Sequence, residues 1–193
     1  MKPLILTMGE PAGIGAEIAA GAWRALRASG PCFALIDDAG RDFGVPVARI
    51  AAPEEAGAVF AQALPILHRP LAVPVVPGNP SPAHASAVIA AIEEAVALAK
   101  SGRAAGVVTN PIQKASLTAA GFPHPGHTEF LGELAGLGAP PVMMLGGILA
   151  YRWCASRRRK KRERSSRRRC PFCIGLWRSR WYRASQALPM PGR

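Results

Sequence analysis

The sequence predicts an α/β protein in which helices cover both faces of a mostly parallel sheet. Over the first 145 of its 193 residues, short apolar runs of strand length alternate with longer stretches that carry apolar residues at helical spacing. Turns rich in Gly and Pro separate these stretches. An apolar fraction of 49% suffices for one domain with a sizeable core, or for two small domains.

The first predicted strand is the apolar run Leu4–Met8, and the turn GEPAGIG follows it. An Ala-rich helix is expected over residues 17–28, where Gly30 ends it. Its expected apolar face consists of Ile18, Ala22 and Leu26. The run Cys32–Ile36 predicts a second buried strand.

Residues 40–80 give a weaker signal, because seven prolines interrupt every periodicity there. Short strands joined by loops are the expected content, and Leu71–Val76 is one candidate strand.

A helix is expected to start at Ser81, which can cap it, with Pro82 in the first helical position. It runs from Ala85 until Gly102 ends it, and its apolar residues at helical spacing are Val88, Ile89, Ile92, Val96 and Ala99.

The remaining predicted elements follow in order along the chain. They are a strand over Gly106–Thr109, a turn at Asn110–Pro111, a short helix over residues 113–120, a helix Glu129–Ala135 that Thr128 caps and Gly136 ends, and a strand over Pro141–Leu145.

Charge divides the chain into two parts. Of 24 Lys and Arg residues, 15 lie in residues 151–193 together with one acid, whereas residues 1–150 hold nine against eleven Asp and Glu. The overall net charge of +12 therefore arises from the last 43 residues, which include the run RRRKKRERSSRRR at 157–169. A polyanionic partner is not indicated for the first 150 residues.

Three interpretations compete for the basic tail, residues 148–193. It could be an arm that binds nucleic acid or acidic lipid through Arg and Trp. It could be a small metal module built on Cys170 and Cys173, but Cys154 alone leaves the ligand set incomplete, since the tail contains no His. The third interpretation is a tail translated out of frame, because it is rich in Arg, Ser, Cys, Trp, Gly and Pro and contains no Asp, Asn or Val.

Two segments are candidates for ligand binding. The loop GEPAGIG places glycines between a strand and a helix N-terminus, which suits either an anionic ligand or simply a tight turn. In the segment TNPIQKASLTAAGFPHPGHTEFLGELAG, residues 109–136, an imidazole and a hydroxyl from His127 and Thr128 can converge at a helix start, and Lys114 follows a strand end. Each also has a structural explanation, as a helix-flanking histidine, a cap or a solvated lysine.

These motifs, in this order and followed by PVMML, resemble the 4-hydroxythreonine-4-phosphate dehydrogenase family of pyridoxal phosphate biosynthesis. The resemblance covers residues 1 to about 145, somewhat under half of a family member. It implies a three-layer α/β/α fold of the isocitrate and isopropylmalate dehydrogenase type, truncated here. Residues 1–147 would then be the N-terminal part of that fold, and residues 148–193 a disordered, out-of-frame tail.

The resemblance also implies a function. Family members oxidise the secondary alcohol of a phosphorylated hydroxy-amino acid with NAD or NADP, and decarboxylation follows. They are homodimers that hold a divalent metal, whose ligands lie beyond the PVMML strand. The resemblance implies that these ligands, the phosphate site and most of the cofactor site are absent from this chain. Of the matching positions, His127 and Thr128 correspond to the substrate-contacting pair, and Lys114 lies in the T-x-P-x-x-K segment. No cofactor-binding residue is assigned.

The chain by itself is therefore expected to be inactive. The remaining alternatives are a related dehydrogenase acting on another phosphorylated hydroxy acid, and a degenerate α/β domain whose basic arm binds nucleic acid. No signal peptide or membrane-spanning segment is evident, and the cysteines form no disulfide framework, so a cytoplasmic protein without a membrane partner is expected.

Overall fold

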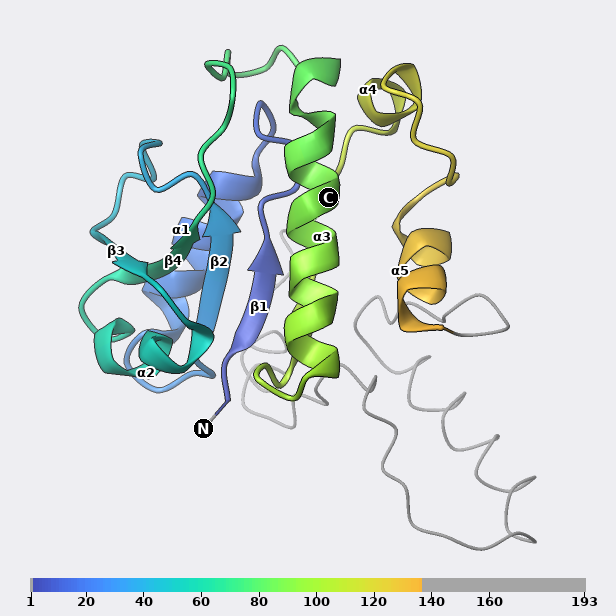
Figure 1. Ribbon diagram of the computed structural model, residues 1–193. Coiled ribbons are helices and arrows are strands. Elements are labelled where there is room, and N and C mark those ends of the chain that lie inside the picture. The colour runs from blue at the N-terminus through green and yellow to red at the C-terminus, as the bar shows by residue number, and fades with distance from the viewer. Residues whose placement is uncertain (1, 137–193) are drawn as a thin grey trace, which may run out of the picture.

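The computed structural model describes residues 2–136. The predicted strand over Pro141–Leu145 and the basic tail lie outside the described residues. Five strands form one parallel sheet in the order β3-β4-β2-β1-β5 (Figure 1). The strands are β1 Leu4–Thr7, β2 Phe33–Asp37, β3 Val47–Ile50, β4 Leu64–His68 and β5 Gly106–Val108.

Helices lie on both faces of the sheet, so the predicted three-layer α/β/α arrangement is confirmed (Figure 1). One face packs against α1, and the opposite face packs against α3, which α5 contacts in turn. The helical elements are α1 Gly15–Leu26, the 3₁₀ turn η1 Pro53–Glu55, α2 Ala56–Val59, the 3₁₀ turn η2 Pro82–His84, α3 Ala85–Lys100, α4 Lys114–Ala119 and α5 His127–Ala135.

Each of the central strands β1 and β2 supplies side chains to two separate cores. Ile5 and Ile36 pack on the α3 side, whereas their neighbours Leu6 and Leu35 pack on the α1 side. Successive side chains of a strand point to opposite faces, so a strand buried on both faces must be apolar throughout. This explains why β1 and β2 appear in the sequence as continuous apolar runs.

The apolar face predicted for α1 is wrong in part. Ile18 is 42% exposed, and Ala22 and Leu26 are only partly buried. The helix instead packs through a stripe that contains Ala19 and Trp23, with the Trp23 indole Nε1 donating a hydrogen bond to the Phe60 carbonyl at 2.7 Å. Small alanines allow the helix to approach the sheet closely, and the buried indole needs that acceptor.

The predicted strand over Leu71–Val76 is also wrong, because these residues form an irregular loop. Pro74 lies inside the segment and has no N–H to give to a ladder, and Val73 and Val76 are 37% and 57% exposed. The strands of the proline-rich region are instead β3 and β4, as short as expected. Pro65 lies inside β4, and because a proline argues against a strand, β4 was difficult to predict from the sequence.

The start of α3 agrees with the sequence prediction. The Ser81 hydroxyl accepts a hydrogen bond from the Ala83 N–H at 3.3 Å, and Pro82 occupies the first position of η2, which leads directly into α3. Of its predicted apolar positions, Val88, Ile92 and Val96 are buried.

By length and composition alone, one described helical segment, Pro82–Lys100, could cross a membrane. It is the core helix of this domain, since α3 packs against the sheet, and buried core helices commonly satisfy such a criterion.

Candidate functional site

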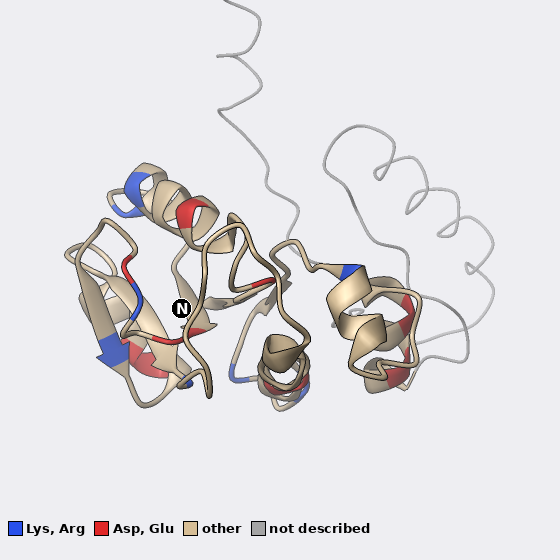
Figure 2. Cartoon of the chain, turned by 90° about the horizontal axis from the view of Figure 1, so that it is seen from above, with Lys and Arg blue, Asp and Glu red and all other residues tan. Residues whose placement is uncertain are grey.

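The direction in which the chain adds strands to the sheet reverses between β1 and β5. From β1 the chain passes through α1 to β2 on one side, whereas α3 carries it from β4 past β1 to β5 on the other. In open parallel sheets the crevice beyond the carboxyl ends of two such strands is the usual ligand site. Figure 2 views the chain from this end of the sheet and shows that basic and acidic residues are interspersed over the described elements.

The two sequence motifs that follow β1 and β5 meet at this edge. The Glu10 N–H donates to the Pro111 carbonyl at 2.8 Å, and the Asn110 side-chain amide donates to the Gly15 carbonyl at 3.2 Å. The Asn110 N–H in turn donates to the Thr7 hydroxyl at 3.4 Å. The GEPAGIG loop and the TNPI turn, about a hundred residues apart, therefore form one unit.

Glycine is required at two positions of the GEPAGIG loop, because other backbone segments approach these positions closely. A Cβ at Gly9 would lie 2.6 Å from the Pro111 carbonyl oxygen, and the φ of Gly9 is +69°. A Cβ at Gly15 would lie 2.5 Å from the Met8 carbonyl oxygen. These contacts are with backbone atoms, which cannot move away from an added Cβ as the end of a flexible side chain can. The tight-turn interpretation of these glycines is thus sufficient to explain them.

We expect Gly15→Ala to lower the free energy of unfolding by about 1–3 kcal/mol, the usual range for a forced steric contact. Gly21→Ala is the matched control, because Gly21 lies in the same helix and a Cβ there would meet nothing within 4 Å. There alanine should stabilise the chain by about 0.5–1 kcal/mol. Urea unfolding of both variants measures the difference, and equal effects would contradict the proposed contact with Met8.

A buried ion pair also contacts the GEPAGIG loop. Both oxygens of the Asp37 carboxylate, at the end of β2, accept hydrogen bonds from Arg41 Nη1 at 2.9 Å. Arg41 Nη2 also donates to the Pro11 carbonyl in the GEPAGIG loop. Burial raises the pKa of Asp37, and the attraction of Arg41 offsets this only in part. This pair was not predicted from the sequence, because its two members lie four residues apart across a strand end, where no periodic pattern links them.

The structure brings two of the three predicted site residues together. Lys114 is the first residue of α4, and His127 is the first residue of α5. A Cβ at Gly126 would lie 3.4 Å from both Cε and Nζ of Lys114, so the lysine chain lies across the start of α5 where glycine leaves room. The Nε2 atom of His127 is buried and has no hydrogen-bond partner.

Thr128 lies in the same helical turn, but it is not the helix cap that the sequence predicted. The N-cap is Gly126 in an extended conformation, and the helix begins at His127. Gly126 has no side chain, and no side-chain cap hydrogen bond is present. The first N–H groups of a helix lack intrahelical acceptors, so such an end attracts anions. The predicted C-terminal residue Gly136 is confirmed, with φ at +70°.

The environment of His127 keeps its imidazole neutral. Burial lowers the pKa of His127, and the positive charge of nearby Lys114 lowers it further. A neutral imidazole close to an ammonium group can exchange hydrogen bonds with a ligand that the lysine attracts.

Because folding lowers the pKa of His127, the unfolded chain takes up this proton more readily than the folded chain. Stability that is present above the ordinary histidine value of about 6.5 is therefore lost as the pH falls below it. We expect the free energy of unfolding, measured in urea between pH 8 and pH 5, to fall less steeply in His127→Gln than in the parent chain. Equal slopes would contradict this assignment.

Among residues 2–136, no group of three or more His, Cys, Asp or Glu side chains could hold a metal ion. The described residues thus do not fit the divalent metal that the resemblance implies. We assign no chemical step to a metal.

The fold is that of an α/β protein with an open parallel sheet whose strand order reverses between β1 and β5, and Lys114 and His127 lie close together in the chain that follows β5. Residues 32–151 match the family model of the pyridoxal phosphate biosynthetic protein PdxA. The chain belongs to this family.

Several similar proteins carry the same name. The chain is 52% identical over 153 residues to a 4-hydroxythreonine-4-phosphate dehydrogenase of Caulobacter vibrioides, covering 75% of this chain and 46% of the relative. A relative of the same name from Methylorubrum populi is 50% identical, with 75% and 45% covered. The crystal structure of a Burkholderia phymatum 4-hydroxythreonine-4-phosphate dehydrogenase superposes with a TM-score of 0.62 at 30% identity, covering 72% of this chain and 45% of that one. The chain thus spans less than half the length of these relatives.

Proposed function

We propose that this chain carries part of the active site of an enzyme that oxidises and decarboxylates 4-hydroxythreonine 4-phosphate with NAD or NADP. The observation that carries the proposal is the position of Lys114 across Gly126, near His127, whose buried Nε2 atom has no hydrogen-bond partner. The names of the relatives supply the substrate. A dehydrogenase of this kind implies a nicotinamide cofactor.

The geometry suits a phosphorylated amino acid. The Lys114 ammonium and the N-terminus of α5 can bind a phosphate group, in addition to the phosphate site that the resemblance places outside this chain. The Glu129 carboxylate lies in the first turn of α5, with Oε2 3.6 Å from the position of a Gly126 Cβ. This carboxylate can bind the ammonium group of the same substrate. The site thus offers a cation for the phosphate, an anion for the amine and a neutral imidazole for a hydroxyl.

The overall reaction removes a hydride from the alcohol carbon and a proton from its oxygen, giving a β-keto acid. The nicotinamide ring supplies the acceptor for the hydride. The carbon–carbon bond to the carboxylate then breaks, carbon dioxide leaves, and the carbon that keeps the electron pair takes up a proton. His127 and Thr128 contact the substrate and orient it for these steps in our proposal.

The relatives have a further part that is not matched by this chain. We propose that this part contains the metal ligands and the surface that contacts the partner in a homodimer. The chain is proposed to be cytoplasmic and to bind a small substrate, without a membrane or nucleic acid partner. The residues described by the structure carry nine basic and eleven acidic side chains, and this balance does not favour the binding of a polyanion such as nucleic acid.

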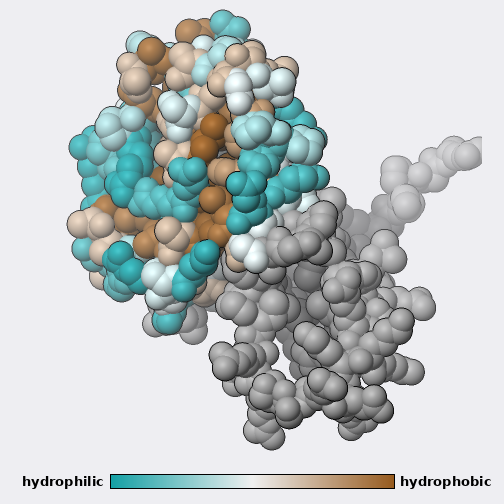
Figure 3. All heavy atoms as spheres, turned by 45° about the vertical axis from the view of Figure 1, so that its right-hand side comes forward, coloured by the Kyte–Doolittle hydropathy of each residue, from teal (hydrophilic) through white to brown (hydrophobic). Residues whose placement is uncertain are grey.

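Apolar residues reach the surface at the carboxyl edge, which lies at the top of Figure 3. Exposed Ile14, Val73 and Val76 belong to the loops that follow β1 and β4. Exposed apolar area favours association, so we propose that the isolated chain has low solubility as well as little activity.

The test compares binding with turnover in the 193-residue chain. We expect calorimetry to detect binding of 4-hydroxythreonine 4-phosphate but not of unphosphorylated 4-hydroxythreonine, because only the former carries the phosphate for Lys114. No NADH should form. Equal binding of both compounds would refute the proposed site, and tighter binding of another phosphorylated hydroxy acid would identify a different substrate. Formation of NADH would refute the proposed inactivity.

We propose further that residues 148–193 are translated out of frame. The coding DNA around codons 143–150 tests this. A second frame that continues the family sequence with further histidine-bearing segments supports the proposal. Closure of both other frames by stop codons would instead indicate a genuine basic arm, for which a salt-dependent gel shift that disappears on deleting residues 151–193 is the direct assay.

A further inference from the structure

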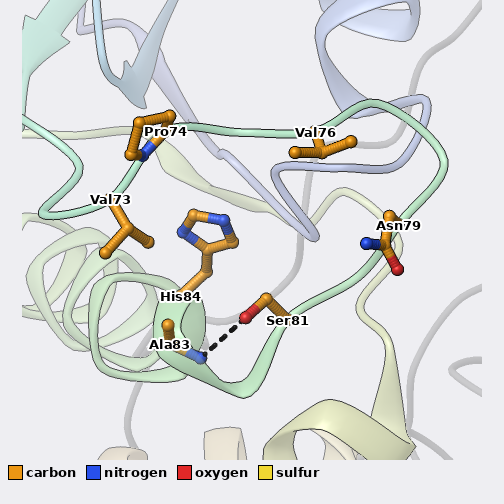
Figure 4. A pocket seen from close by; sticks show the side chains of 7 residues that line it. All are labelled: Val73, Pro74, Val76, Asn79, Ser81, Ala83 and His84. Atoms are coloured by element: carbon orange, nitrogen blue, oxygen red, sulfur yellow. Dashed lines mark hydrogen bonds between the residues drawn. The ribbon is translucent and has the colours of Figure 1, made fainter.

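A recess lies at the carboxyl edge, outside the Lys114 site. It has a volume of about 290 Å³ and lies between the loop that follows β4 and the start of α3 (Figure 4). Its lining residues are Val73, Pro74, Val76, Asn79, Ser81, Ala83 and His84. The volume is close to the lower limit of about 300 Å³ for ligand pockets, so it suits a single ring rather than a whole dinucleotide.

His84 is the unusual member of this lining. It is only 2% exposed, and its Nδ1 atom is buried without a hydrogen-bond partner. The imidazole extends from η2 to lie among Val73, Pro74 and Val76 (Figure 4). A buried polar atom without a partner is destabilising and needs an explanation. Across residues 2–136 only one other fully buried side-chain nitrogen or oxygen lacks a partner, Nε2 of His127 in the proposed substrate site.

The recess adjoins the structures that form the substrate site. The Gly78 N–H donates to the Ala12 carbonyl at 2.8 Å, which joins the recess loop to GEPAGIG. On the other side η2, which carries His84, contacts α4, the helix that begins with Lys114. A hydride acceptor must lie beside the substrate, so the reacting end of the cofactor has to reach this edge.

The lining chemistry selects the kind of group that fits. Val73, Pro74 and Val76 offer apolar walls, and no Lys, Arg, Asp or Glu lines the recess. A phosphate would therefore find no cation there. Asn79 and Ser81 are polar but uncharged, and with His84 they suit a flat ring that carries an amide.

We propose that this recess takes the nicotinamide ring of the cofactor and that His84 forms a hydrogen bond with its carboxamide. This assignment rests on the proposed function. A carboxamide has both a donor and an acceptor, so it can pair with either tautomer of the imidazole. His84 is thus a positioning residue and takes part in no bond change. Since Val73 and Val76 are partly exposed, their side chains can move to admit the ring without disturbing the core.

The experiment uses the full 193-residue chain labelled with ¹⁵N-histidine, and nicotinamide itself as the probe. We expect nicotinamide to shift the ring-nitrogen resonances of His84, and adenosine, which represents the other end of the cofactor, to leave them in place. His84→Leu should weaken nicotinamide binding about three- to tenfold, the effect of one hydrogen bond. His84→Gln should restore most of it, because an amide can still pair with the carboxamide.

A shift of His84 by adenosine alone, or by neither probe, would overturn the assignment, as would unchanged nicotinamide binding in His84→Leu. A parallel titration with 4-hydroxythreonine 4-phosphate, followed at His127, separates the two proposals. If His127 responds and His84 does not, only the nicotinamide site fails. If neither histidine responds to its ligand, the proposed function fails as well.

Discussion

Replacing Lys114 with methionine is expected to weaken binding of 4-hydroxythreonine 4-phosphate at least tenfold. A hydrogen bond between charged groups contributes about 1.5–3 kcal/mol, and each 1.4 kcal/mol changes affinity tenfold. Lys114 lies across Gly126 at the start of α5, with Nζ 3.4 Å from the position of a Gly126 Cβ. Methionine has a similar length and an apolar end, so it keeps the packing of the chain while removing the charge.

Lys2→Met is the matched control for this experiment. Lys2 precedes β1 and therefore lies at the opposite end of the parallel strands from Lys114. The same loss of one positive charge there should leave substrate affinity unchanged, because the site is remote and salt screens exposed charges. Calorimetry of the parent chain and both variants measures the effect. Equal losses in the two variants would show that Lys114 acts only through net charge.

The Lys114 variant also reports on His127. Lys114 lowers the pKa of His127 through charge repulsion, in addition to the larger effect of burial. Removing the ammonium should therefore raise the pKa of His127 part of the way towards its ordinary value, and an NMR titration can follow this change. An unchanged pKa would mean that the lysine does not approach the imidazole in solution.

The second large effect concerns stability. Arg41→Met is expected to lower the free energy of unfolding by about 3 kcal/mol or more, as when one partner of a buried ion pair is removed. The Asp37 side chain is fully buried and would lose the guanidinium that contacts both of its oxygens. The Pro11 carbonyl would lose a donor in the same variant.

Urea unfolding measures this loss, and two further variants define its cause. Arg103→Met removes an equivalent contact with Glu54 at the surface, where ion pairs contribute little, so unfolding should hardly change. The double variant Asp37→Asn with Arg41→Met should recover much of the lost stability, because the buried charge is removed with its partner. No recovery would mean that Arg41 acts mainly through Pro11.

The pH dependence of Arg41→Met gives an independent check. Burial already raises the pKa of Asp37 above its ordinary value, and Arg41 opposes that rise. Without Arg41 the pKa should rise further. The penalty of the variant should then shrink as the pH falls and Asp37 becomes protonated in the folded state. A penalty that is constant between pH 8 and pH 4 would contradict this account.

Local sequence patterns predicted the elements that are continuous and apolar. Strands β1 and β2 are buried on both faces, so they are apolar up to the polar residues Thr7 and Asp37 at their carboxyl ends, and α3 combines helical spacing with a Ser81–Pro82 start. Strands β3 and β4 were less evident. Pro65 interrupts the apolar run of β4, and β3 at the sheet edge is largely accessible to solvent. The prediction of a strand at Leu71–Val76 was wrong, because a run of apolar residues in a loop has the same sequence pattern as a short strand.

The sequence by itself determined the α/β class, the order of most elements and the family, because these depend on periodicity and on motifs that are contiguous in the chain. It also singled out Lys114, His127 and Thr128. Only the tertiary structure decided which groups meet. The contact between GEPAGIG and Asn110 and the Arg41 bond to Pro11 join segments that are distant in sequence, and the burial of the His84 Nδ1 atom without a hydrogen-bond partner also depends on tertiary packing. A one-dimensional pattern cannot specify such contacts, since they arise when parallel strands bring their carboxyl ends to one edge.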